Sequence, residues 1–172
     1  MLVRQWVETI GPDDYIFHCG DVALGPIRES LEYVRRLTGM KVLVIGNHDR
    51  NFRLGKRSGG LEPDEWDAEY TSYGFDFVVE NTVVDLGTEE TGTIYFNVSH
   101  FPYDGDSHDG DRFEEARLPD EGVPLIHGHT HSSGDPLTFS SNGTPQIHVG
   151  VDAWDFRPVS QEQVLEVWRR AV

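Results

Sequence analysis

The sequence predicts an α/β domain, because short apolar strands alternate with amphipathic helical segments along the chain. Four runs rich in β-branched and aromatic residues each end in glycine and polar residues, as buried strands do. These runs are DYIFHCGD (14–21), KVLVIGNHD (41–49), TIYFNVSH (93–100) and VPLIHGHTH (123–131). The length of 172 residues suits one domain, so we treat residues 1–172 as a single unit.

A helix is predicted between the first two strands, over residues 25–39. Its apolar residues recur at helical spacing, Pro26 occupies a suitable first helical position, and Gly39 ends the segment. Strand, helix and strand in this order are typical of a parallel β-α-β unit. A C-terminal helix is predicted over residues 160–172, which begin with the pattern of a capping box.

Two stretches do not follow this alternation. Residues 50–70 start basic and glycine-rich and turn acidic, which predicts a loop with a short helix after Pro63. Residues 104–122 are crowded with carboxylates, but an EF-hand loop needs glycine at its sixth position, where this chain has Asp109. We therefore interpret the second stretch as a solvated acidic loop.

The charge and cysteine content exclude several classes of protein. Fourteen Lys and Arg residues stand against thirty Asp and Glu residues, giving a net charge of −16 that disfavours binding to extended nucleic acid. A single cysteine, Cys19, cannot form an intrachain disulfide. No apolar run has the length of a signal peptide or a membrane span, so we expect a cytoplasmic protein without membrane contact.

Polar side chains follow each of the four predicted strands. They are Asp21 after the first, Asn47, His48 and Asp49 after the second, His100 after the third, and His127, His129 and His131 after the fourth. In open α/β sheets, groups beyond the carboxyl ends of the strands converge on one crevice. A carboxylate, an amide and several imidazoles suit Mn, Fe, Co, Ni or Zn, and the absence of thiolates argues against a structural zinc site.

The alternative reading is that these histidines are ordinary packed residues, which is the commoner case for an isolated histidine. Four clusters at four strand ends, each with a glycine that permits a tight turn, favour metal binding instead. We expect structural roles for the four remaining histidines and core packing for Cys19. The four are His18, His108, His127 and His148.

The motifs GD (20–21), GNHD (46–49), SH (99–100) and GHTH (128–131) resemble those of the calcineurin-like metallophosphoesterases. The resemblance extends from about residue 13 to the end, and residues 149–160 also resemble small bacterial and phage members. It implies a two-sheet β-sandwich flanked by helices in four layers. It also implies two divalent metal ions that activate a water for in-line attack on phosphorus.

The resemblance assigns roles to individual residues. The implied metal ligands are Asp21 as a bridge, Asn47, His100 and His129 for one ion, and His131 for the other. His48 is expected to act on the leaving oxygen without touching a metal, while Asp49 holds its imidazole. Arg50 is a candidate phosphate contact, with pairing to the acidic surface as the alternative.

The start of the chain departs from the family pattern. Members open with a strand ending in Asp-x-His, whereas residues 1–12 here carry an apolar helical stripe without an N-cap. Either the true start lies upstream, and a strand with two ligands is missing, or this is a reduced member with an incomplete site. In both cases we expect one tightly held ion, weak activity, exposed strand edges and a tendency to associate.

The sequence is compatible with three functions. The first is hydrolysis of a small phosphomonoester, phosphodiester or nucleotide. The second is nuclease activity, which the acidic charge opposes unless the mouth of the site is locally basic. The third is a non-catalytic scaffold that binds a protein partner, favoured by the missing Asp-x-His and opposed by the presence of His48. The sequence does not predict the substrate, the metal or the oligomeric state.

Overall fold

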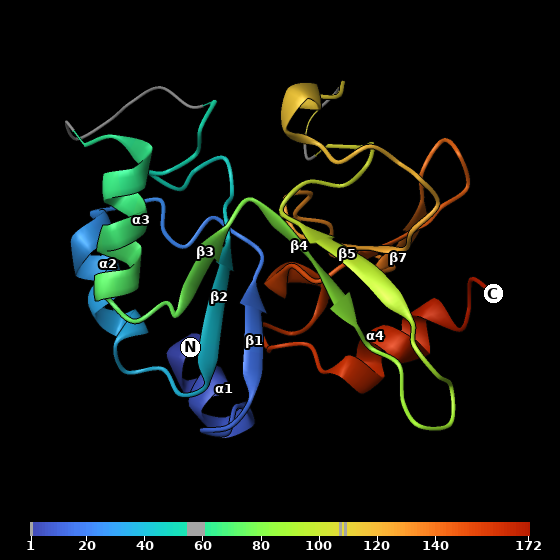
Figure 1. Cartoon of the computed structure of the whole chain (residues 1–172), viewed down its shortest axis with the longest axis horizontal. Coiled ribbons are helices and arrows are strands. Elements are labelled where there is room, and N and C mark those ends of the chain that lie inside the picture. Colours follow the sequence, from blue (N-terminus) through green and yellow to red (C-terminus); the bar gives the residue numbers. More distant parts are fainter. Residues whose placement is uncertain (1, 55–60, 107, 109) are drawn as a thin grey trace.

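Two β-sheets lie side by side in the computed structural model, which describes residues 2–54, 61–106, 108 and 110–172 (Figure 1). The first sheet has three parallel strands in the order β1-β2-β3. The strands are β1 (Tyr15–His18), β2 (Met40–Val44) and β3 (Phe77–Val79). Polar segments follow β1 and β2 at the same edge of this sheet, because the two strands are parallel.

The second sheet has five strands in the order β4-β5-β6-β8-β7. They are β4 (Asn81–Asp85), β5 (Tyr95–Ser99), β6 (Leu125–His127), β7 (Leu137–Phe139) and β8 (Pro145–His148). The central strands β5, β6 and β8 are parallel to one another, whereas β4 and β7 pair antiparallel at the two edges. The carboxyl ends of β5 and β6 therefore also share one edge.

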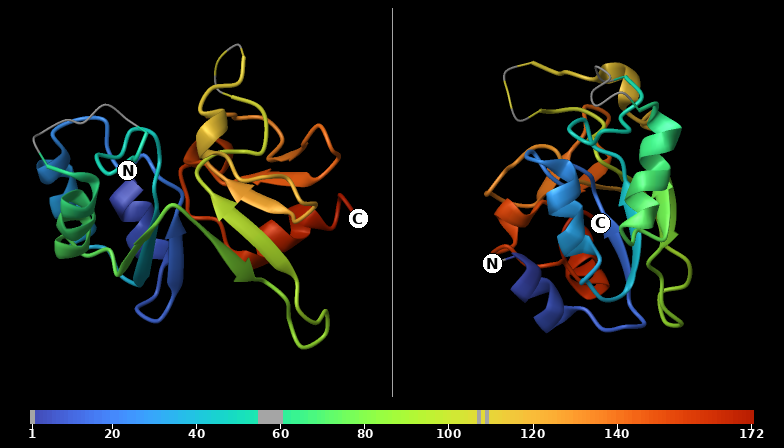
Figure 2. Two further views of the ribbon diagram at one scale, coloured as in Figure 1. Left: turned by 45° about the horizontal axis from the view of Figure 1, so that its top comes forward. Right: turned by 90° about the vertical axis from the view of Figure 1, so that its left-hand side faces the viewer.

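Helices flank the two sheets. They are α1 (Leu2–Thr9), α2 (Ile27–Val34), α3 (Pro63–Ser72) and α4 (Gln161–Trp168). In Figures 1 and 2, α2 and α3 cover one side of the first sheet, and α4 lies against the second sheet, where it contacts β8. This arrangement confirms the prediction of a two-sheet α/β fold flanked by helices.

The four predicted strands and the parallel β-α-β unit are confirmed. Residues of β1 pair in parallel with those of β2, from Tyr15 opposite Met40 onwards. The helix between them is shorter than predicted, because α2 ends at Val34 and Pro26 is its N-cap residue. The chain then makes tight turns to Gly39, whose φ of +84° favours glycine.

Two predicted helices are also confirmed. The helix α3 begins at Pro63, and a reciprocal capping box joins Glu62 to Glu65. The helix α4 opens with the predicted box, in which the Ser160 side chain accepts from the backbone N–H of Gln163. Part of the basic loop before α3, residues 55–60, lies outside the described residues.

Two apolar clusters hold the layers together. One joins both sheets to α4 and includes Val44, Phe96 and Leu165. The other lies between the first sheet and the helices α2 and α3, where Leu31 and Tyr70 are fully buried. Both sheets thus pack against a shared core, which holds their strand ends in fixed positions relative to one another.

A cavity of about 890 Å³ runs beside β1, which is an edge strand of the first sheet. Its walls are mostly apolar and include Trp6 of α1, Phe17 of β1 and Val98 of β5. The helix α1 carries the predicted apolar stripe, yet none of its residues is buried.

Within the described parts of the chain, we find no helix that combines the length and the apolar character needed to cross a membrane.

Candidate metal centre

Two glycine turns bring the ends of β1 and β2 into contact. A Cβ atom on Gly20 would lie 2.5 Å from the backbone N of Gly46 and 2.6 Å from Nδ1 of His100. A Cβ atom on Gly46 would lie 2.3 Å from Oδ1 of Asp21. Side chains at these positions would force the two turns apart, so the glycines of the GD and GNHD motifs are needed for packing.

Asp49 joins the same two turns through its buried carboxylate. Its Oδ2 accepts hydrogen bonds from the backbone N of Gly46 at 2.8 Å and of Asp21 at 2.9 Å. Its Oδ1 accepts from the backbone N of Val22 at 2.9 Å and lies 3.3 Å from the Tyr70 hydroxyl. Burial raises the pKa of the Asp49 carboxyl, and the backbone hydrogen bonds oppose that shift.

These contacts correct the expected role of Asp49. The sequence predicted that it holds the imidazole of His48, but its oxygens face backbone donors of the two turns. His48 is exposed, and its backbone N donates to Oδ1 of Asp21 at 2.8 Å. The geometric reason is that the Asp49 carboxylate points into the protein, whereas His48 lies at the surface.

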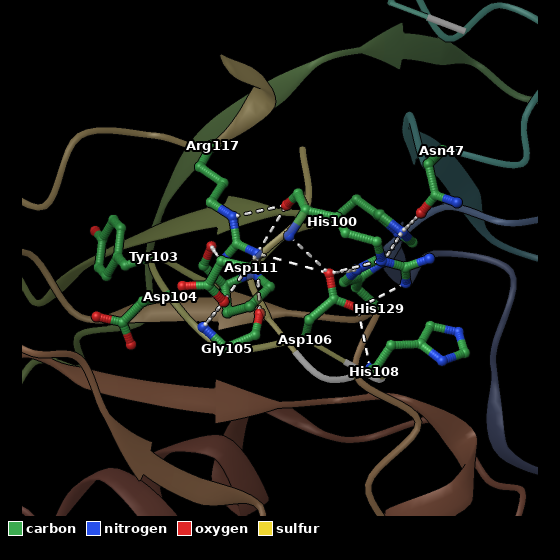
Figure 3. A network of polar contacts seen from close by, with 12 residues as sticks. Asn47, His100, Tyr103, Asp104, Gly105, Asp106, His108, Asp111, Arg117 and His129 are labelled. Carbon is green, nitrogen blue, oxygen red and sulfur yellow. Dashed lines mark hydrogen bonds and ion pairs between the residues drawn. The ribbon is translucent and has the colours of Figure 1, made fainter. Parts of the chain in front are cut away.

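Donor atoms from three separate strand ends converge on one point. Nε2 of His100 lies 3.0 Å from Oδ1 of Asn47 and 3.2 Å from Nδ1 of His129. Oδ2 of Asp21 lies further away, 3.7 Å from Nε2 of His100. Figure 3 shows the side chains of Asn47, His100 and His129 directed toward one another. The structure thus places the side chains of Asn47, His100 and His129 together, with Asp21 nearby, and their role as ligands of one metal stays a prediction.

The backbone determines which nitrogen of His100 is available. Nδ1 lies 2.7 Å from the carbonyl oxygen of Cys19, which can only accept, so Nδ1 carries the proton of the neutral ring. Nε2 then carries a lone pair, directed at Asn47 and His129. Gly128 allows this approach, because a Cβ atom there would lie 2.9 Å from the same carbonyl oxygen.

His129 is held in a strained and buried position. Its φ is +65°, a region that non-glycine residues rarely adopt, and its side chain is almost fully buried. Burial and the nearby His100 lower the pKa of His129 to about 4, so its imidazole is neutral at neutral pH. A neutral imidazole is the form that binds metals.

The arrangement fits a divalent transition metal ion. Ligands at about 2.1 Å from an octahedral ion lie about 3 Å from their neighbours, close to the 3.0 Å and 3.2 Å observed here. The set is partial, since among the described residues no three or more His, Cys, Asp or Glu side chains form a group that could hold a metal ion by themselves. Two imidazoles and the Asn47 amide converge, and Asp21 stands slightly apart.

His131, predicted as a ligand of the second metal, has different surroundings. Its side chain is 65% exposed, and Nδ1 lies 3.0 Å from Oδ2 of Asp152. Asp21, His131 and Asp152 all line the cavity beside β1. His131 also has a positive φ, of +51°. Both histidines of the GHTH motif, on either side of Thr130, therefore adopt a left-handed backbone conformation.

Arg50 is exposed at its predicted position after the GNHD turn. Its backbone N donates to the Tyr70 hydroxyl at 3.1 Å, and the same hydroxyl contacts Asp49. Tyr70 of α3 therefore holds the backbone of Arg50 and the side chain of Asp49. Whether the Arg50 guanidinium contacts a phosphate remains a prediction.

The prediction of a solvated acidic loop is wrong for Asp106. Its side chain is only 1% exposed and pairs with Arg112, with Nη2 of Arg112 2.6 Å from Oδ1. Its Oδ2 lies 3.4 Å from Nε2 of His129. Sequence reasoning missed this residue because nothing in a run of carboxylates distinguishes the one that folds inward.

The other histidines lie outside the centre. His127 and His148 are buried on neighbouring strands with ring centroids 5.5 Å apart, and burial lowers the pKa of His127 to about 3. His18 packs edge-on against Phe75, and His108 is exposed. Cys19 is half-buried beside the core, and burial raises the pKa of its thiol to about 12.

The two-sheet α/β fold and the polar side chains gathered at its strand ends agree with the comparison to known proteins. The sequence profile of the calcineurin-like phosphoesterases matches residues 2–133. The chain therefore belongs to the calcineurin-like phosphoesterase family.

Similar proteins come from phages and a bacterium. The Gene 66 protein of Mycobacterium phage D29 is 36% identical over 168 residues, covering 93% of this chain and 78% of the relative. The Gene 66 protein of Mycobacterium phage L5 is 34% identical over 171 residues, covering 96% and 78%. A crystal structure of a protein of unknown function from Aquifex aeolicus matches with a TM-score of 0.62 at 21% identity. That match covers 96% of this chain and 82% of the other, and it shows the shared fold alone.

Proposed function

We propose that this protein is a metal-dependent phosphoesterase that hydrolyses a small phosphate ester, a monoester, a diester or a nucleotide. Membership of the family supports a metal-dependent phosphoesterase in general terms. The observation that carries the proposal is the convergence of Nε2 of His100, Oδ1 of Asn47 and Nδ1 of His129. These atoms lie close together, and the contact of His100 Nδ1 with the Cys19 carbonyl oxygen directs the lone pair on Nε2 of His100 toward the other two.

The residues around this point divide into holding and reacting groups. Asn47, His100 and His129 would hold the ion, with Asp21 as a further oxygen ligand. A bound divalent ion would supply positive charge that lowers the pKa of a water and stabilises phosphoryl oxygens. Mn, Fe, Co, Ni and Zn all suit this mixed set of nitrogen and oxygen donors.

We assign His48 the role of acting on the substrate. It is exposed, and its backbone N is held by Asp21, itself a proposed ligand. This hydrogen bond fixes the backbone of His48 beside Asp21 and leaves its side chain at the surface, where the imidazole can meet the leaving oxygen. We infer that protonated His48 donates a proton to that oxygen as the ester bond breaks.

The charge of the chain supports a small substrate. A net charge of −16 repels a long polyanion, whereas a single phosphate group needs only local cationic groups. Arg50 is exposed and lies two residues after His48, so it can supply one such group. Nuclease activity on long nucleic acids is therefore the weaker alternative.

Hydrolysis assays test the proposal. Purified protein stripped of metal should gain activity toward aryl phosphomonoesters or phosphodiesters when Mn²⁺ is added, and lose it with a chelator. Single-stranded and duplex DNA serve as the nuclease comparison under the same conditions. Metal binding without hydrolysis of any ester would contradict the enzyme and favour the scaffold alternative, whereas an absence of metal binding would contradict the metal centre itself.

A further inference from the structure

The loop of residues 104–117 places one carboxylate behind the metal centre. Asp106 is the residue concerned, and its side chain is 1% exposed although it belongs to the most acidic stretch of the chain. Burying a carboxylate costs free energy unless charged or hydrogen-bonding partners compensate for the lost water. The neighbours of Asp106 therefore indicate what the burial achieves.

Two arginines hold this carboxylate. Arg112 contacts both oxygens, with Nη2 2.6 Å from Oδ1 and Nε 3.2 Å from Oδ2. Nη2 of Arg117 lies 3.9 Å from Oδ2, and its guanidinium also donates to the carbonyl oxygens of Pro102 and Gly105. Arg112 donates hydrogen bonds to both oxygens, so Asp106 is held in a fixed orientation as a hydrogen-bond acceptor.

The carboxylate faces His129. Oδ2 of Asp106 lies 3.4 Å from Nε2 of His129, and Figure 3 shows Asp106 between Arg117 and His129. The distance is long for a hydrogen bond, and Nε2 is buried without a closer partner among the described residues. A carboxylate can only accept, so it favours the ring form with the proton on Nε2.

That proton position determines what His129 presents to the metal. With the proton on Nε2, the lone pair lies on Nδ1, the atom that is 3.2 Å from Nε2 of His100. The two lone pairs then face each other across a short distance, an arrangement that a cation stabilises. Histidine ligands in metal sites commonly donate their second ring N–H to a carboxylate or a carbonyl, which fixes the ring and raises its basicity.

We propose that Asp106 is a positioning residue that fixes the tautomer and orientation of His129 for metal binding, with Arg112 and Arg117 holding it in place. This inference rests on the proposed metal centre. Asp106 faces one ring nitrogen of His129 as an acceptor, just as the Cys19 carbonyl oxygen faces Nδ1 of His100. The aromatic rings of Phe101 and Phe113, 4.9 Å and 5.9 Å from the His129 ring, complete the enclosure.

The tautomer of His129 provides a direct test. Long-range proton–nitrogen NMR of the wild-type, metal-free protein at neutral pH should show the His129 proton on Nε2. A proton on Nδ1 would overturn the proposal, whatever the behaviour of any variant. This measurement depends neither on hydrolytic activity nor on the folding of a mutant.

Substitutions test the effect on affinity, with calorimetric titration of Mn²⁺ or Zn²⁺ as the measurement. Asp106→Ala should weaken binding by about 10- to 100-fold. Asp106→Asn keeps an oxygen acceptor and should lose less. Asp111→Ala is the matched control, because Asp111 lies in the same loop and contacts Gly105 and Arg117, at 2.8 Å and 3.5 Å. It should bind metal within about 3-fold of wild type.

The outcomes separate this proposal from the proposed function. Unchanged affinity in Asp106→Ala, or an equal loss in Asp111→Ala, would overturn the positioning role while leaving the metal centre intact. Failure of the wild-type protein to bind either ion would contradict the proposed function instead. Thermal unfolding of each metal-free variant shows whether the loop change alters stability, and the wild-type tautomer decides the matter if Asp106→Ala does not fold.

Discussion

The two histidines of the GHTH motif lie two residues apart and have opposite surroundings. The side chain of His129 is almost fully buried, and its two ring nitrogens lie near His100 and Asp106. The side chain of His131 is 65% exposed and contacts Asp152 beside the cavity. The same motif therefore places His129 in an enclosed set with Asn47 and His100, and His131 at an open side of the site.

The difference teaches what prepares a side chain for metal binding. The His129 side chain is already desolvated and ordered in the folded protein, because its backbone, ring and neighbours are fixed by packing. The exposed His131 side chain keeps its conformational freedom and would lose it only when an ion binds. We therefore expect the side of His100 and His129 to hold one ion tightly and the side of His131 to contribute weakly.

The largest expected effect tests the enclosed set. His100→Ala removes the nitrogen that contacts both Asn47 and His129, and should weaken Mn²⁺ binding by at least about 100-fold. Calorimetric titration measures the loss, and His131→Ala is the matched control, with an expected change below about 10-fold. Equal losses in the two variants would break the comparison between the enclosed and open sides.

His48→Ala distinguishes holding the metal from acting on the substrate. Turnover of a phosphodiester should fall by about 100-fold, because the leaving oxygen would lack its proton donor, while metal content stays unchanged. Steady-state kinetics and metal analysis of the same preparation make the measurement. Loss of bound metal in this variant would show that His48 belongs to the ligand set.

Gly46→Ala tests whether the enclosed set depends on close contact between two turns. The new Cβ would lie 2.3 Å from Oδ1 of Asp21, and we expect a loss of about 2 to 3 kcal/mol of unfolding free energy together with weaker metal binding. Gly25→Ala is the control, since a Cβ there meets no atom within 4 Å. Denaturant unfolding compares the two, and a Gly46→Ala protein as stable as Gly25→Ala would contradict the packing argument.

The smallest expected effect concerns the open side. Asp152→Asn removes the charge beside His131 and should change the tight metal affinity by less than about 3-fold, because neither residue contacts His100 or His129. Titration with Mn²⁺ under the conditions used for His100→Ala provides the comparison. A loss as large as that of His100→Ala would place Asp152 and His131 within the principal metal site.

Much of the fold and of the site could be predicted from short patterns. Runs such as KVLVIGNHD combine β-branched residues with a glycine turn, so strand, turn and site residues are local signals. The capping box of α4 is equally local, as is the helix after Pro63. A general rule about the carboxyl ends of strands predicted that the polar clusters converge, and the family resemblance assigned Asn47, His100 and His129 to one ion.

The structure corrected the predictions where partners lie far apart in sequence. Asp49 accepts from backbone groups near Asp21, twenty-eight positions earlier, instead of holding the adjacent His48. A local pattern contains no information about such distant contacts.

The sequence by itself determined the α/β class, the strand ends that carry the site and the residue types suited to a divalent metal. Those features depend on periodicity, turn chemistry and donor chemistry, which act over a few residues. Only the tertiary structure decided that Asp106 lies behind His129, that the Cys19 carbonyl orients His100, and that His131 faces outward. The physical reason is that burial and hydrogen-bond partners belong to the packed chain, and identical side chains in one acidic loop acquire different roles only when packing encloses one of them.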